Sequence, residues 1–194
     1  METYQKILDE AIIEIREQEY QEMLENKGET SDGTAPVPLP QNMKFTSDCI
    51  IDTDMELLLP ESYVENITER LKIYRQLDNV KDEQGLQQIA KKLTDRFGKI
   101  PEPTEQLFNV VRMRWIAIEL GMLKIILKNG KMICYFIEDQ DSPYYQSEVF
   151  GRIINHHNGK DSVLKPVNGK PCLVVEKITN PEKALIFLKK IYDN

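Results

Sequence analysis

The chain has 194 residues, of which 41% are hydrophobic and 29% are charged, and its formal net charge at pH 7 is −7. This composition is that of one globular domain with an appendage, or of two small domains. The acidic balance argues against sequence-independent DNA or RNA binding, because clustered Lys and Arg bind phosphate backbones. Neither a signal peptide nor an apolar run of roughly 20 residues is present, so we expect no membrane insertion and a cytoplasmic location.

Residues 3 to about 25 have the pattern of an amphipathic helix. Glu, Gln and Arg occupy most of its faces, and its apolar stripe consists of Tyr4, Ile7, Leu8, Ala11, Ile12 and Ile15. Such a stripe needs an apolar partner. Three partners are open: the chain's own domain, a neighbouring copy with which the protein would self-associate, or another module of a longer protein. The Gly, Pro and Ser content of residues 26–47 is typical of a linker. We therefore predict boundaries at 1–25, 26–47 and 48–194.

A strand is expected from Cys49 until Pro60 ends it. Three helices should follow, over 61–78, 82–97 and 103–120. The side chains expected to point inward from the first are Val64, Ile67, Leu71, Tyr74 and Leu77, and from the third Leu107, Val110, Val111, Trp115 and Ile118.

Two Asn-Gly pairs in the second half predict β-hairpins, at 129–130 and at 168–169. The flanking strands are expected at 123–127, 132–137, 162–165 and 172–175, with helices at 143–156 and 181–192. The predicted fold class is α+β: a helical subdomain plus a small mixed or antiparallel sheet with packed helices, preceded by an isolated amphipathic helix and a linker.

Asp52, Asp54 and Glu56 occupy every second position of the strand expected from Cys49, so they would lie on one side of it. Three carboxylates on one face are a candidate Mg²⁺ site for a metal-dependent hydrolase. The alternative is a charged face that keeps an edge strand soluble. No phosphate-binding loop, nucleophile elbow or Cys-x-x-Cys pair is present, so we assign no catalytic, cofactor-binding or metal residue. The three isolated cysteines are interpreted as small buried hydrophobic residues.

Residues 93–103, Leu-Thr-Asp-Arg-Phe-Gly-Lys-Ile-Pro-Glu-Pro, place a helix end, a turn and a new helix start in succession. With Leu-Leu-Leu-Pro-Glu-Ser-Tyr-Val (57–64), Arg-Leu-Lys-Ile-Tyr-Arg-Gln-Leu (70–77) and Glu-Gln-Leu-Phe-Asn-Val-Val-Arg-Met-Arg (105–114), this order resembles the C-terminal domain of bacterial transcription-repair coupling factors (Mfd). The resemblance covers residues 48–194, most densely 56–121. Residues 4–11, Tyr-Gln-Lys-Ile-Leu-Asp-Glu-Ala, resemble the segment that ends the family's motor module, so we expect a fragment of a longer protein.

The resemblance implies a non-catalytic autoregulatory domain of an ATP-dependent DNA translocase, with the ATPase outside this chain. In that family the domain packs on a UvrB-like N-terminal module of the same protein, masks the UvrA-binding surface and restrains the motor. RNA polymerase and DNA are engaged by other domains. We place the candidate intramolecular interface at Lys91, Lys92, Asp95 and Arg96, although Asp95 and Arg96 can equally tie a helix end to its neighbour. The alternative function is an accessory domain that contacts RNA polymerase or DNA.

Overall fold

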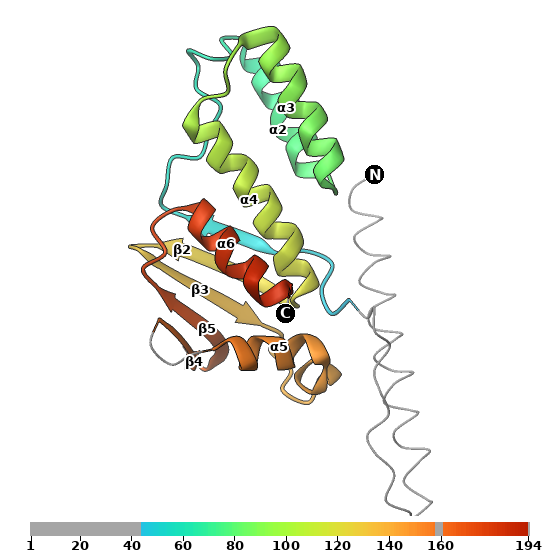
Figure 1. Ribbon diagram of the computed structural model, residues 1–194, viewed down its shortest axis with the longest axis vertical. Coiled ribbons are helices and arrows are strands. Elements are labelled where there is room, and N and C mark those ends of the chain that lie inside the picture. The colour runs from blue at the N-terminus through green and yellow to red at the C-terminus, as the bar shows by residue number, and fades with distance from the viewer. Residues whose placement is uncertain (1–43, 158–160, 194) are drawn as a thin grey trace, which may run out of the picture.

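The computed structural model describes residues 44–157 and 161–193 and has the predicted α+β architecture (Figure 1). The expected amphipathic helix at 3–25 and most of the expected linker lie outside the described residues. A five-stranded sheet has the strand order β1-β2-β3-β5-β4, in which β1 is parallel to β2 and all other pairs are antiparallel. The strands are β1 (Ile50–Thr53), β2 (Met122–Lys128), β3 (Lys131–Phe136), β4 (Ser162–Val167) and β5 (Lys170–Glu176).

Both Asn-Gly hairpins are confirmed. Asn129 and Gly130 have φ values of 54° and 72°, and Asn168 and Gly169 have 51° and 79°. A type I′ turn requires positive φ at both central residues, which Asn and Gly tolerate better than other residues. These turns set the strand registers, in which Lys128 pairs with Lys131 and Val167 pairs with Lys170.

Five α-helices and one 3₁₀ turn complete the part of the chain that the structure describes. Side chains of Asn66, Asp82, Ser147 and Asn180 cap four of the helices by accepting hydrogen bonds from backbone N–H groups in the first turn. The helices are α2 (Ile67–Asn79), α3 (Glu83–Phe97), α4 (Glu102–Glu119), α5 (Glu148–His156) and α6 (Pro181–Tyr192), with the 3₁₀ turn η1 at Pro143–Gln146.

Two predicted boundaries around Pro60 were wrong. The strand from Cys49 ends at Thr53, where the Thr53 hydroxyl accepts a hydrogen bond of 3.2 Å from the Met55 N–H and turns the chain. The first helix begins at Ile67 instead of residue 61, because the N–H groups of Tyr63 and Val64 both donate to the Pro60 carbonyl and close a separate turn.

The inward face predicted for α2 was also partly wrong. Ile67 and Leu71 are 64% and 52% exposed, whereas Ile73 and Leu77 are buried. Since α3 and α4 both pack on the Ile73 side, the buried stripe is rotated around the helix axis from the expected one. A further correction concerns 143–156, where Ser147 ends η1 and caps α5, so that two elements replace one helix.

The buried residues form two cores that share α4. The helical core contains Leu59, Val64, Ile73, Leu77, Leu86, Leu93, Phe108 and Val111. The sheet core lies between the inner sheet face and α4, α5 and α6, and its largest members include Phe136, Tyr144, Ile125, Met113 and Leu188. Figure 1 shows the upper half of α4 beside α2 and α3, while its lower half lies with α6 across one face of the sheet. All three cysteines are buried and unpaired, as predicted.

Candidate protein interface

The outer face of α3 carries the four residues assigned to the interface from the sequence. Lys91, Lys92, Asp95 and Arg96 are all exposed, because α3 directs Leu86 and Leu93 into the helical core and leaves the opposite side to solvent. Among the residues that the structure describes, no ion pair involves Lys91, Lys92 or Asp95. These three charges are therefore available to a partner.

Arg96 has a structural role in addition to its exposure. Its guanidinium forms an ion pair with Glu69 of α2, and its central carbon lies 5.0 Å from the centroid of the Phe97 ring. The hydroxyl of Tyr63 donates a 2.9 Å hydrogen bond to the carbonyl of Gly98, which follows α3 with φ of 83°. Arg96 thus ties the end of α3 to α2, the alternative role considered for it.

The two lysines of this face differ in position. Lys92 and Arg96 line a cavity of about 240 Å³ between α2 and α3, together with Glu69 and Phe97 among others. Residues four apart share a helix face, so Lys91 and Asp95 lie together on the neighbouring strip of α3. The structure therefore divides the four predicted residues into one pair over the α2–α3 cavity and one pair beside it.

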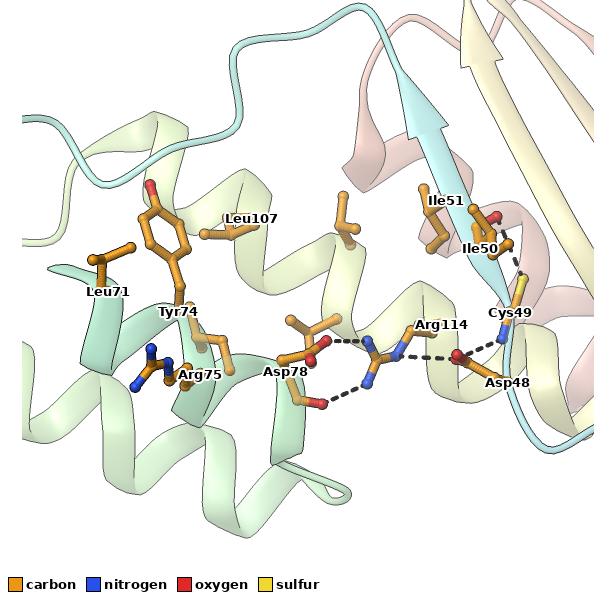
Figure 2. Close-up of a pocket in the computed structure, with 13 residues that line it drawn as sticks. Asp48, Cys49, Ile50, Ile51, Leu71, Tyr74, Arg75, Asp78, Leu107 and Arg114 are labelled. Carbon is orange, nitrogen blue, oxygen red and sulfur yellow. Dashed lines mark hydrogen bonds and ion pairs between the residues drawn. The ribbon is translucent and has the colours of Figure 1, made fainter. Parts of the chain in front are cut away.

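A larger groove of about 570 Å³ lies between β1, α2 and α4, and the sequence reasoning did not identify it (Figure 2). Leu71 and Tyr74 line it from α2, Leu107 and Val110 from α4, and Ile50 from β1. Leu71 and Ile50 were missed because the sequence pattern predicts hydrophobic residues without saying which remain uncovered when the elements pack.

Arg114 crosses this groove and links the helical subdomain to the sheet. It donates hydrogen bonds of 2.8 Å to Oδ1 and 2.6 Å to the backbone carbonyl of Asp78, at the end of α2, while its Nε lies 4.0 Å from Asp48 Oδ1 (Figure 2). The same Asp48 oxygen accepts a 2.8 Å hydrogen bond from the Cys49 N–H. Burial, assisted by the Asp48 charge, raises the pKa of the Cys49 thiol to about 12. Cys49 is thus an inert apolar residue.

A second ion pair fastens α3 to α4. Arg112 forms two hydrogen bonds with the Glu83 carboxylate, at 2.8 and 2.7 Å, and the nearby indole of Trp115 donates a 3.1 Å bond to the Val80 carbonyl. The hydrogen bonds from Arg112 lower the pKa of Glu83, and those to Glu83 raise the pKa of Arg112. These contacts attach the start of α3 to α4, and the outer face of α3 remains exposed to solvent.

The structure does not assemble the carboxylates of the hydrolase alternative. Because β1 ends at Thr53, Asp52, Asp54 and Glu56 do not share one strand face. Asp52 pairs with Lys128 at 2.8 Å, which lowers the pKa of Asp52, and Asp54 accepts a hydrogen bond from the Asn129 N–H. Within residues 44–157 and 161–193, no group of three or more His, Cys, Asp or Glu side chains could hold a metal ion. Nor is any helix of these residues long and apolar enough to cross a membrane.

Comparison with known proteins identifies related sequences. A family model described as the TRCF domain matches residues 53–147. The transcription-repair-coupling factor of Escherichia coli strain K12 is 33% identical over 75 residues, which cover 39% of this chain and 6% of that protein. The factor of Buchnera aphidicola is 35% identical over 82 residues (42% and 10%), and that of Rickettsia bellii is 22% identical over 185 residues (93% and 14%). The chain thus spans at most 14% of the length of these three relatives.

The fold is also shared with a solved structure. A crystal structure of the C-terminal domain of transcription-repair coupling factor superposes with a TM-score of 0.61 at 16% identity, covering 75% of this chain and 92% of that one. The resemblance inferred from the sequence is confirmed: residues 53–147 match the TRCF domain, and the fold is that of the C-terminal domain of a transcription-repair coupling factor.

Proposed function

We propose that this domain is the non-catalytic autoregulatory domain of a transcription-coupled DNA repair translocase. In the full-length protein, residues 48–194 pack against the UvrB-like module, mask its UvrA-binding surface and restrain the motor. Residues 1–25 belong to the end of the motor module, 26–47 form the linker, and the ATPase lies outside this chain. The match of residues 53–147 to the TRCF domain supports this assignment.

The exposed charged side chains on the outer face of α3 support the proposed interface. Lys91, Lys92 and Asp95 are exposed on a helix held by the Arg96–Glu69 and Arg112–Glu83 pairs, so binding would not have to order it. An interface of exposed charges can open, since such domain contacts are polar and coupling energies are typically about 1–3 kcal/mol. The complementary surface would place acidic groups opposite the lysines and a basic group opposite Asp95.

Calorimetric titration of the 194-residue chain into the separately expressed UvrB-like module tests this proposal, with UvrA as competitor. We expect binding that UvrA abolishes and that Lys92→Glu weakens about tenfold or more, because a reversed charge meets a like charge. Lys183→Glu on α6 is the matched control, since its ammonium contacts only the Thr179 hydroxyl among the described residues, and it should bind like the wild type.

Binding that is equally sensitive to both substitutions would refute the α3 assignment while leaving the masking mechanism in place. If no binding is detected at high micromolar concentration, the masking mechanism is wrong for this protein. The alternative, contact with RNA polymerase or DNA, would then be tested by direct titration, where DNA binding must weaken steeply with salt.

A further inference from the structure

The sheet face opposite the helices carries an aliphatic row across four strands. The pairing register places Ile126 opposite Ile133, Ile133 opposite Val174, and Val174 opposite Val163, so these four side chains are direct cross-strand neighbours. Neighbouring strands are about 4.8 Å apart, which makes the row about 14 Å long. We call these four residues the outer row.

The outer row belongs to neither core. No member is among the residues packed in the sheet core or the helical core, whereas alternate residues of the same strands, such as Ile125 and Cys134, are fully buried under the helices. Figure 1 shows α4 and α6 on the same side of the sheet. Val163 is 38% exposed, Ile126 and Ile133 are half-buried, and Val174 is 6% exposed, so the row is open at its β4 end and partly open along β2 and β3. The solvated face of an antiparallel sheet ordinarily carries polar residues, so the exposed and half-buried members of this row indicate a surface that another element can cover.

Lysines surround this row. The outward positions of the five strands carry five lysines (Lys124, Lys128, Lys131, Lys165 and Lys170) and two acidic residues (Asp52 and Glu176). Asp52 and Glu176 pair with Lys128 and Lys131, and Lys170 pairs with Glu138 from outside the strands. The face is therefore locally basic in a chain whose net charge is −7, and it suits an acidic amphipathic partner.

We propose that residues 3–25 of this same chain are that partner and cover the outer row as an added helix. Residues 1–25 contain eight acidic and two basic side chains, the opposite charge balance to the sheet face. The apolar stripe from Tyr4 to Ile15 is about 17 Å long at 1.5 Å per residue and matches the length of the outer row. Docking would give the sheet a helical layer on each face.

The tether permits this arrangement. Lys44, where the described chain begins, pairs with Glu119 at the end of α4, and Phe45 packs on Tyr144 in the sheet core, on the face that the helices cover. The tether would therefore have to pass around an edge of the sheet. The eighteen intervening residues, 26–43, span at most about 60 Å when extended. A flexible chain of this length has a mean end-to-end distance of about 24 Å, comparable to the size of the domain. This inference is independent of the α3 interface. It places residues 3–25, which the proposed function assigns to the end of the motor module, on the sheet of the C-terminal domain.

Carbodiimide cross-linking of the full chain, followed by mass spectrometry, tests the proposal because the reagent joins carboxylates directly to lysines. Cross-links are expected between the acids of residues 1–25 and the lysines of the sheet face, among them Lys124, Lys128, Lys131 or Lys165. Ile12→Asp in the stripe and Val163→Asp in the outer row should each reduce their yield about tenfold. Ile186→Asp is the matched control, since Ile186 is a 49% exposed residue on α6 away from this face, and it should leave the yield unchanged.

A mixture of isotopically light and heavy protein separates contacts within one chain from contacts between copies. Cross-links confined to light–light and heavy–heavy pairs support docking within the chain. Light–heavy cross-links in the proportion expected for random pairing would overturn docking within the chain and would indicate that the segment exchanges between copies. Cross-links to lysines elsewhere, or yields that Ile12→Asp does not change, would overturn the assigned surface.

Discussion

Leu93→Ala in α3 tests the two-core description of the fold most directly. Leu93 is 3% exposed and lies in the helical core, so its truncation removes buried apolar surface and leaves a cavity. Such changes lower the free energy of unfolding by about 2–5 kcal/mol. The assay is urea denaturation followed by circular dichroism, from which the free energy of unfolding is obtained by linear extrapolation.

Leu71→Ala in α2 is the matched control. Both leucines lie in helix interiors, so the change in helix propensity is the same in the two variants, but Leu71 is 52% exposed. Full burial of a leucine is worth about 1.5–3 kcal/mol, so half-burial predicts a loss of about 1 kcal/mol. Equal losses in the two variants, or a larger loss for Leu71→Ala, would refute the orientation assigned to α2 and the helical core.

Three further predictions follow from single sites. Gly121→Ala should destabilise the protein by more than about 1 kcal/mol in thermal denaturation, because φ is 70° and an added Cβ would lie 2.3 Å from the Tyr144 ring; an unchanged melting temperature would contradict this. Arg112 lowers the pKa of Glu83 in the folded protein below its ordinary value of 4.5. The contribution of this ion pair to the free energy of unfolding should therefore be complete above pH 4.5 and be lost as the pH falls through the lower folded-state pKa. Glu83→Gln should flatten that part of the curve of urea midpoint against pH. Cys49, with its raised pKa, and the other two buried cysteines should not react with a thiol reagent at neutral pH until the protein is unfolded; fast labelling of the native protein would contradict their burial.

The elements that the sequence predicted well are those specified by local chemistry. The two Asn-Gly pairs have the positive φ values that their turns require, and α3 begins and ends where Asp82 and Gly98 stand in the chain. These signals depend on a few adjacent residues and the backbone conformations open to them. Hence the strand positions in both hairpins and the bounds of α3 agree with expectation to within about two residues.

The features that could not be predicted depend on packing between distant segments. The face of α2 that is buried is decided by contacts with α3 and α4, and the 61–78 pattern has apolar residues on more than one face. The groove beside Arg114 arises only when α2 and β1 lie on either side of α4 (Figure 2). In the outer row, aliphatic residues occupy both faces of β2, so the sequence alternation does not distinguish the covered face from the open one.

The arrangement of α4 bears on how an autoregulatory domain of this kind would release its partner. Phe108 and Val111 belong to the helical core and Met113 and Ala117 to the sheet core, so one uninterrupted helix is part of both. The ion pair between Arg114 and Asp78 closes the remaining gap between α2 and this helix. Bending the domain between its two parts would break α4 or expose a core, at a cost above the roughly 1–3 kcal/mol typical of coupling between sites. The proposed autoregulatory domain would therefore release its partner as an intact unit, by separation at its surface. Substitutions at Lys91, Lys92 or Asp95 should change its affinity for the UvrB-like module without changing the stability of the domain.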